Sequence, residues 1–345
     1  MVKSNASLLA LGIVFALTSC GGDTSGGGAA PPVVIAPTPP VTPPPPPPPP
    51  TVASTERDVA PATTNPALTD NLSAHFAINP APAAAKNRLF VMLPGTGGVP
   101  RNTRLIVRAG AARGYHSVGL TYPNDEAVGT ICSASVRPDC AGEVRREIIT
   151  GADTSPLVAV TQPNSIVGRL TALLSYMQAT YPLEGWSQYL VGGAPNWSQI
   201  TVAGHSQGAG HAGYMAKLYV LDRAVMLSGP GDVGNGAGTP ALWITLPNAT
   251  PAARQYGFIH RADELVPVAL AEFNWSQIGL GAFGTSVSVD GSAAPYGDRR
   301  QLTTNVAITG ASSSAHGATV VDVRTPLTAG GEPLYLPVWN YMAFP

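Results

Sequence analysis

The predicted fold depends on one stretch of the chain, Ile200-Thr201-Val202-Ala203-Gly204-His205-Ser206-Gln207-Gly208-Ala209-Gly210-His211. A run rich in β-branched residues leads into Gly-x-Ser-x-Gly, and small residues follow, which predicts a buried strand that turns sharply into a helix. The serine of such a turn has a strained backbone, and only small residues two positions before and after it avoid clashes. Gly204, Ser206 and Gly208 have this spacing. We therefore predict a nucleophile elbow with Ser206 at its apex.

Two other interpretations apply to this stretch. Gly-x-Ser-x-Gly arises by chance in glycine-rich chains, and this chain has 38 Gly in 345 residues; the strand and helix patterns around it favour the elbow. The six residues that start at Gly208 also fit Gly-x-Gly-x-x-Gly, but a dinucleotide site needs its first glycine directly after the strand and an acid about 20 residues later. Here the strand is expected to end near Ala203 and Asp222 comes early. We expect no nucleotide cofactor.

The composition limits the classes of partner. Residues 86–345 have an ordinary globular composition, and this length suits one α/β domain with a sizeable core. The whole chain has a formal net charge of -1 and only 11% charged residues. A nucleic-acid-binding protein needs a basic surface, for which this chain has no footprint. We expect no nucleic-acid partner.

The first 20 residues have the pattern of an export signal. Lys3 precedes an apolar run at 8–17, which is too short to span a bilayer and is typical of a signal peptide. Leu17-Thr18-Ser19-Cys20 resembles a bacterial lipobox, in which the cysteine becomes the lipidated first residue of the mature protein. We predict a lipoprotein-type signal peptide over 1–20, lipidation at Cys20 and anchoring to a membrane surface. An ordinary cleaved signal with an unrelated cysteine is the alternative.

Residues 21–51 are a predicted tether. They are rich in Gly, Ser and Pro and contain eight consecutive prolines at 43–50, which favours an extended polyproline II spacer of ~3.1 Å per residue. A ligand for a proline-recognition module is the alternative, but export favours the spacer. Residues 52–85 are a lead-in segment poor in large apolar side chains, with a first edge strand expected at 74–78.

Apolar runs and helical spacings predict alternating strands and helices over 86–345. The predicted strands are residues 88–93, 117–121, 200–203, 223–227 and 255–260, with weaker patterns at 285–289 and 304–308. The predicted helices are residues 103–113, 165–180 and 209–219. This alternation implies an α/β fold with a mostly parallel central sheet flanked by helices.

Three segments resemble the α/β-hydrolase family: the loop Leu93-Pro94-Gly95-Thr96-Gly97-Gly98, the elbow Gly204-His205-Ser206-Gln207-Gly208 and the late pair His316-Gly317. The resemblance covers about residues 86–345, and the elbow is its most specific part. It implies the α/β-hydrolase fold, a serine carboxylesterase or lipase activity, and no metal or cofactor. The same fold hosts other activities, so it does not define the substrate.

The resemblance also implies an oxyanion hole. In that family the loop after the first central strand supplies one N–H donor, often within a His-Gly motif. This chain has Pro94-Gly95 there, which makes Thr96 the candidate donor. The second donor is expected from the backbone of Gln207, the residue after the nucleophile. A plain glycine-rich turn is the alternative; no Gly-Lys-Ser/Thr follows to indicate a phosphate loop.

A serine nucleophile needs a base, usually a histidine oriented by a carboxylate. The family places these residues in the order Ser, Asp or Glu, His. Of six histidines, three follow the serine: His211, His260 and His316. His211 falls on the elbow helix and His260 ends a predicted strand, whereas His316 lies in a late loop before a helix-like run. We predict His316 as the base.

Three acids are candidates for the third member. Asp263 follows the strand at 255–260 and begins Asp-Glu-Leu-Val-Pro, which resembles the acid loop of many family members. Asp232 follows the preceding strand, a position that some lipases use. Glu264 is expected to be a solvated neighbour. We favour Asp263 and keep Asp232 as the alternative.

Residues 125–160 are interpreted as an excursion over the sheet and a candidate lid. Cys132 and Cys140 lie within it, with seven residues between them. In an exported protein such a pair can form a disulfide, and two free thiols are the alternative.

The favoured function is that of an exported, membrane-anchored serine hydrolase that cleaves carboxylic esters through an acyl-enzyme on Ser206. An extracellular polyester depolymerase is the first alternative, because a lipid anchor and a long tether suit work on a polymer. A catalytically silent surface-binding protein on the same fold is the second. The expected partners are an ester substrate, small or polymeric, and the membrane.

Overall fold

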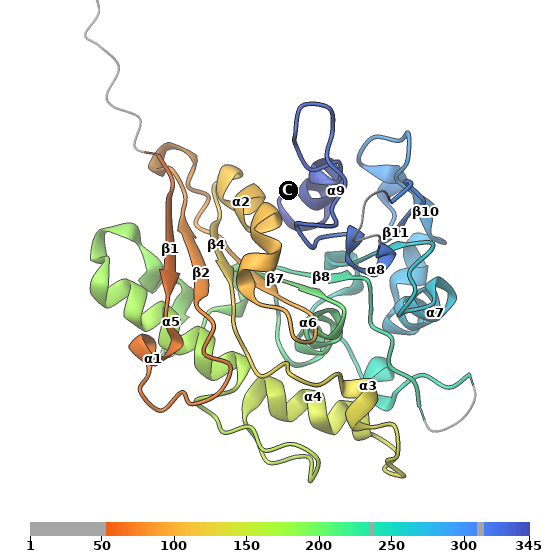
Figure 1. Cartoon of the computed structure of the whole chain (residues 1–345), viewed down its shortest axis with the longest axis horizontal. Helices are drawn as coiled ribbons and strands as arrows, with labels where there is room; N and C mark the ends of the chain where they lie inside the picture. The colour runs from red at the N-terminus through yellow and green to blue at the C-terminus, as the bar shows by residue number, and fades with distance from the viewer. Residues whose placement is uncertain (1–52, 235–237, 309–313) are drawn as a thin grey trace, which may run out of the picture. The chain divides into compact units, whose positions relative to one another are not determined.

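The computed structural model describes residues 53–234, 238–308 and 314–345. The predicted signal peptide 1–20, with its lipidation site Cys20, and the tether 21–51 lie outside the described residues. A large β-sheet crosses the described chain, and helices cover both of its faces (Figure 1).

The sheet combines an antiparallel side with a longer parallel side. Its strands, in chain order, are β1 (Thr55–Val59), β2 (His75–Asn79), β3 (Leu89–Leu93), β4 (His116–Gly119), β7 (Ile200–His205), β8 (Arg223–Leu227), β9 (Gln255–His260), β10 (Val287–Ser288) and β11 (Gln301–Thr304). Their order across the sheet is β1-β2-β4-β3-β7-β8-β9-β11-β10. The β1–β2 and β2–β4 pairs are antiparallel, and the other neighbours pair parallel. A separate small hairpin consists of β5 (Leu190–Val191) and β6 (Ala194–Pro195).

The central strands are apolar because both faces of the sheet are covered. Every residue of β3 and β7 is buried. Successive residues of a strand point to opposite faces, so β3 contributes Leu89, Val91 and Leu93 to one core and Phe90 and Met92 to the other.

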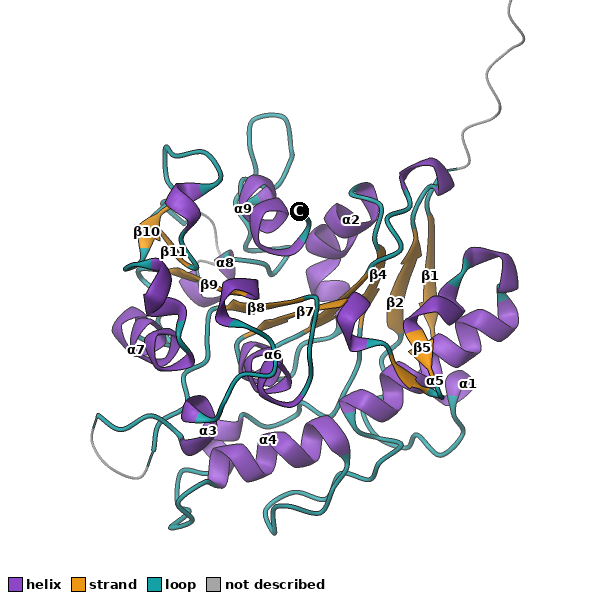
Figure 2. Cartoon of the chain, turned by 180° about the vertical axis from the view of Figure 1, so that it is seen from behind, coloured by secondary structure: helices purple, strands orange, loops and turns teal. Residues whose placement is uncertain are grey.

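The α-helices form two layers around the sheet. In chain order they are α1 (Pro61–Thr64), α2 (Arg104–Ala112), α3 (Val128–Ile131), α4 (Cys140–Thr150), α5 (Ile166–Thr180), α6 (Gln207–Leu218), α7 (Val268–Ile278), α8 (Ala315–Ala318) and α9 (Leu336–Ala343). Helices α4, α5 and α6 cover one face, and α2 and α9 lie together on the other, as Figure 1 and Figure 2 show from opposite sides.

The predicted α/β architecture, a mostly parallel sheet flanked by helices, is confirmed. The predicted edge strand at 74–78 corresponds to β2, but β2 is not at the edge, because β1 pairs with its outer side. The lead-in segment therefore supplies two strands of the sheet. The strand β1 has no apolar pattern to reveal it; its charged side chains pair with other segments, as in Arg57–Glu184 and Glu56–Arg108, and charges suit an edge strand.

Two further differences concern element bounds. The strand expected at 304–308 is β11, which ends where that pattern begins, at Thr304. Helices α4, α7 and α9 were not predicted, and α4 lies inside the excursion 125–160.

None of the helices in the described ranges is both long enough and apolar enough to cross a bilayer.

Candidate active site

The residues predicted to act on a substrate all follow strands of the parallel sheet. Thr96 follows β3, Ser206 follows β7, Asp263 follows β9 and His316 follows β11. The carboxyl ends of parallel strands share one edge of the sheet, where α/β proteins bind their ligands. The topology therefore gathers residues that are far apart in the sequence.

Ser206 occupies a strained turn between β7 and α6. Its backbone has φ 56° and ψ -116°, a conformation that residues other than glycine rarely adopt. The Ser206 N–H donates to the Leu227 carbonyl at 2.8 Å. A Cβ on Gly204 would lie 2.0 Å from the carbonyl oxygen of Gly208, and a Cβ on Gly208 would lie 2.3 Å from that of Leu93. Close packing requires both glycines, as expected for an elbow.

The loop after β3 closes against the elbow. A Cβ on Gly95 would come within 3.1 Å of the Ser206 Cβ. The hydroxyl of Thr96 donates to Oε1 of Gln207 at 2.7 Å, which joins the residues of the two predicted oxyanion donors. Within the described residues, the backbone N–H groups of Thr96 and Gln207 have no hydrogen-bond acceptor. Gln207 also begins α6, whose N-terminus carries partial positive charge. Both N–H groups are available to a developing oxyanion.

His316 and Asp263, the predicted base and acid, are hydrogen-bonded to each other. Nδ1 of His316 lies 2.9 Å from each carboxylate oxygen of Asp263, so Nδ1 is the donor. The backbone N–H groups of Leu265 and Val266 donate to the same carboxylate at 3.0 and 2.8 Å. Asp263 is thereby fixed as an acceptor that sets the orientation of the imidazole.

The other ring nitrogen of His316, Nε2, is buried and has no hydrogen-bond partner among the described residues. His316 lines a pocket of about 770 Å³ together with Ser206, Thr96 and Gln207; we name it the serine pocket. A histidine with one nitrogen held by a carboxylate and the other unpaired, in a pocket that a serine also lines, can accept the serine proton.

The backbone of His316 is held from both sides. Nε2 of His205 donates to the His316 carbonyl at 2.8 Å, and the Glu264 carboxylate accepts from the His316 N–H at 3.0 Å. Glu264 also accepts a bond from the hydroxyl of Ser314. His316 lies in α8, a helix of four residues, and one turn of helix has little stability of its own. The position of the base therefore depends on these side chains.

The protonation states of the two holding residues suit this role. Burial and the neighbouring His316 lower the pKa of His205 to about 4, so His205 is a neutral donor at neutral pH. Burial acts to raise the pKa of Glu264, but hydrogen bonds from Ser314 and the backbone outweigh it, and that pKa is lowered. Glu264 is therefore a carboxylate, the stronger acceptor.

Asp232, the alternative acid, is engaged elsewhere. Its carboxylate oxygens accept from Nε and Nη2 of Arg145 at 2.5 Å each, and the indole N–H of Trp243 donates to it at 2.7 Å. Arg145 also donates to the carbonyl of Gln207 at 2.9 Å. Asp232 neutralises a buried arginine that holds the start of the elbow helix. This arrangement does not support Asp232 as the partner of His316.

The other histidines have different surroundings. His260 bonds to the Val306 carbonyl through Nε2 and accepts from the Ala262 N–H through Nδ1. His211 is fully buried in α6, and burial lowers its pKa well below the usual range. His116, for which the sequence favours a structural role, bonds to the Tyr189 hydroxyl at 2.7 Å.

The excursion 125–160 borders the serine pocket. Cys132 and Cys140 form a disulfide in it, which joins the segment after α3 to the first residue of α4. Val128 and Gly129 of α3 line the serine pocket, and α4 supplies Arg145. The excursion thus both shapes the pocket and braces the elbow.

Sequence patterns did not reveal the roles of Arg145, His205 and Glu264. Arg145 is 87 residues from Asp232, so no local spacing links them. His205 occupies a position of the elbow pattern that admits any residue. Glu264 is exposed, as expected, but the sequence did not reveal its bond to the His316 N–H; the one available signal was its adjacency to the favoured acid.

Comparison of the chain with protein-family models and with curated proteins gave no match. Across 53–234, 238–308 and 314–345, no group of three or more His, Cys, Asp or Glu side chains is placed to hold a metal ion.

Proposed function

We propose that the chain is a serine hydrolase that cleaves carboxylic esters through an acyl-enzyme on Ser206. One observation carries the proposal. Asp263 holds Nδ1 of His316, while Nε2 is left without a partner in a pocket that Ser206 also lines. An oriented base with one unpaired nitrogen beside a strained serine has the parts needed for acyl transfer.

The proposed reaction has two stages. His316 Nε2 takes the proton as Ser206 Oγ attacks the ester carbonyl carbon, and the resulting oxyanion accepts from the N–H groups of Thr96 and Gln207. The C–O bond to the alcohol then breaks, and His316 returns the proton to the leaving oxygen. In the second stage His316 takes a proton from water, which attacks the acyl carbon; the bond from that carbon to Ser206 Oγ breaks, and His316 returns the proton to Oγ, which releases the acid and free Ser206.

We propose the α/β-hydrolase fold for residues 55–345. The strand order, the elbow after β7, and an acid and a base after two later strands support it. The assignment rests on the arrangement of elements and on the order Ser206, Asp263, His316.

We also propose that the protein is exported and anchored to a membrane through Cys20. The lipobox-like sequence is one support. The disulfide between Cys132 and Cys140 is another, since disulfides persist mainly in oxidising compartments. Metabolic labelling with a fatty-acid analogue tests the anchor, and labelling that survives Cys20→Ser contradicts it.

The test of catalysis is labelling of the mature domain with a fluorophosphonate, followed by peptide mapping. We expect the adduct on Ser206, and we expect Ser206→Ala to abolish both the adduct and the hydrolysis of short esters. Ser198→Ala, at a serine outside the pocket, is the matched control and should label fully. A folded protein that neither labels nor hydrolyses esters contradicts the proposal and favours the non-catalytic binding protein.

A further inference from the structure

We propose that a second pocket beside the serine pocket binds a further segment of the substrate, and that this substrate is an uncharged linear polyester. The proposal rests on the proposed ester hydrolysis and names its substrate class. The second pocket has a volume of about 520 Å³, and we name it the side pocket.

The two pockets adjoin each other, because Val128, Gly129, Gly231 and Asp232 line both of them. A substrate whose reacting carbonyl lies at Ser206 would extend past these four residues into the side pocket. The combined space is larger than a short ester needs, because drug-sized ligands already fill pockets of about 300–1,000 Å³.

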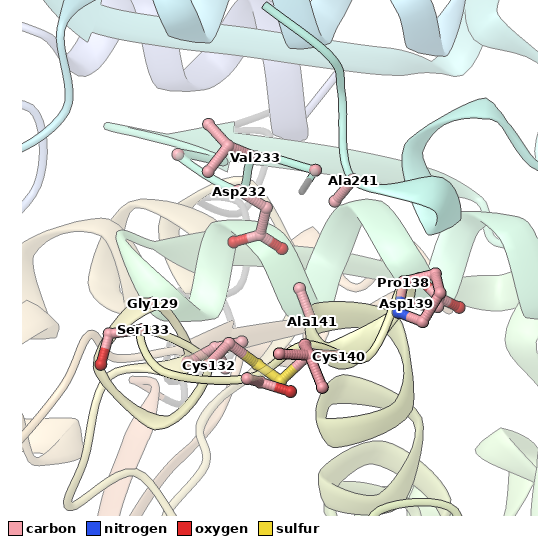
Figure 3. Close-up of a pocket in the computed structure, with 15 residues that line it drawn as sticks. Gly129, Cys132, Ser133, Pro138, Asp139, Cys140, Ala141, Asp232, Val233 and Ala241 are labelled. Atoms are coloured by element: carbon pink, nitrogen blue, oxygen red, sulfur yellow. A yellow bond between two sulfur atoms is a disulfide. The ribbon is translucent and has the colours of Figure 1, made fainter. Parts of the chain in front are cut away.

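The disulfide loop forms one wall of the side pocket. Figure 3 shows the Cys132–Cys140 disulfide on one side of the opening, and Val233 and Ala241 on the other. The disulfide closes the loop that bears this wall, which keeps a segment without strands or long helices in place.

The walls of the side pocket combine hydrocarbon with polar groups. Val128, Pro138 and Val233 supply hydrocarbon. Ser135 accepts a hydrogen bond from the Arg137 N–H at 3.2 Å, so its own hydroxyl proton remains to be donated to a ligand carbonyl. A polyester alternates ester oxygens with short hydrocarbon. A long fatty acyl chain would instead place hydrocarbon against the polar groups, which is unfavourable.

The charges disfavour an anionic ligand. The charged side chains among the described lining residues of the side pocket are the acids Asp139 and Asp232. Asp232 is paired with Arg145, and burial and the charge of Glu143 raise the pKa of Asp139. Arg324 lines the serine pocket but not the side pocket. A carboxylate or phosphate would meet no cation in the side pocket.

Exposed aliphatic side chains surround the openings of both pockets. They are Val136 (91% exposed), Val233 (59%), Leu265 (69%) and Val323 (80%). A single exposed aliphatic residue is ordinary, but two at each of two adjoining pockets offer an apolar contact surface. Such a rim suits contact with a solid polymer whose chains enter the pockets.

A bulky residue at the junction tests whether one ligand occupies both pockets. A Cβ on Gly129 would meet no atom within 4 Å, so Gly129→Phe fits the fold and occupies the space shared by the pockets. Gly129→Ala is the size control, and Gly330→Phe, at an open position outside both pockets, is the bulk control. Val233→Ser is a second variant that removes part of the rim.

The first readout is a ratio of kcat/KM values, for an end-capped hydroxy-acid tetramer over a single-ester analogue. We expect Gly129→Phe to lower this ratio about tenfold or more and Val233→Ser to lower it less, with both controls at the wild-type ratio. An unchanged ratio in Gly129→Phe overturns the proposal, even if both rates fall. If Gly129→Phe leaves this ratio unchanged but lowers kcat/KM for long-chain fatty acyl esters relative to the single-ester analogue, the pocket holds hydrocarbon and the polyester is overturned.

The second readout is independent of turnover. Polyester particles are sedimented with the Ser206→Ala protein, and with the same protein carrying Gly129→Phe or Val233→Ser in addition, and the fraction of protein in the pellet is measured. We expect retention that each added substitution weakens severalfold. Retention that neither substitution changes overturns the proposal. If the wild type hydrolyses no ester but particle binding still depends on Gly129 and Val233, the proposed function is refuted and binding in the side pocket is supported. Failure of the hydrolysis and failure of the side pocket are therefore distinguishable.

Discussion

The proposed nucleophile and the proposed base are held in opposite ways. Ser206 stands in a contiguous elbow, where Gly204 and Gly208 allow the strand and the helix to touch through their backbones. His316 stands in a four-residue helix and is held by the side chains of Asp263, Glu264 and His205. The first geometry comes from neighbours in the sequence, and the second comes from three long-range hydrogen bonds. We therefore expect substitutions at the elbow to damage folding and those around the base to damage catalysis.

The largest expected effect separates two buried acids. Asp263→Asn removes the carboxylate that orients His316, and we expect kcat to fall about 10,000-fold with little change in unfolding free energy. Asp232→Asn leaves the buried Arg145 without its counter-charge, and we expect a loss of about 3 kcal/mol in stability. Ester kinetics and urea unfolding of both variants measure the two effects.

Each of these variants is the control for the other. If Asp232→Asn proved stable and inactive while Asp263→Asn kept its activity, the assignment of the acid would be reversed.

The next effect tests the elbow. Gly208→Ala would place a Cβ 2.3 Å from the Leu93 carbonyl oxygen, so the backbone must shift, and we expect a loss of about 3 kcal/mol in unfolding free energy. Gly129→Ala is matched to it, because that Cβ meets nothing within 4 Å, and we expect a gain of about 0.5 kcal/mol. Equal stabilities in urea titration would show that the elbow does not need its glycine.

A smaller effect tests the contacts that hold the base. We expect Glu264→Gln and His205→Ala each to lower kcat about tenfold, with KM and the thermal midpoint nearly unchanged, because His316 loses one of its backbone contacts. His205→Gln keeps a side-chain N–H donor and should recover part of the loss. Glu332→Gln, at an exposed acid outside the serine pocket, is the control for charge. If both variants lost stability while kcat stayed at the wild-type value, the role of both residues would be purely structural.

The smallest expected effect is the pH dependence of the unfolding free energy that comes from two buried histidines. Burial lowers the pKa of His205 to about 4 and that of His75 to about 3, from 6.5. In the window between 6.5 and 4 the unfolded chain therefore binds protons that the folded protein does not. This stability is present above pH 6.5 and is lost as the pH falls, by up to about 1.4 kcal/mol per pH unit for each histidine.

His75→Asn isolates one of these contributions, since an amide oxygen can accept the Thr121 N–H that now bonds to Nδ1. We expect its unfolding free energy, measured from pH 4 to 7, to depend less steeply on pH than that of the wild type. Identical slopes would show that His75 does not contribute.

Several elements could not be read from the sequence for a common reason. Strand β1 is polar and is defined by its pairing with β2 and by ion pairs to distant residues. Helix α4 lies in a segment without clear strand or helix signals, and Arg145 within it meets an acid 87 residues away. Such features depend on partners that no local window contains.

The sequence by itself determined the elbow and the layered α/β architecture. Apolar runs define buried strands, and Gly204 faces the Gly208 carbonyl only a few residues later, so a local pattern is sufficient there. Gly208 instead faces the Leu93 carbonyl at the end of the neighbouring strand β3. Tertiary structure alone placed Asp263 beside His316 and Asp232 beside Arg145, joined Thr96 to Gln207, placed His205 and Glu264 around His316, and set the two pockets next to each other. These contacts join loops at the ends of different strands, and only the order of strands in the sheet brings those ends together.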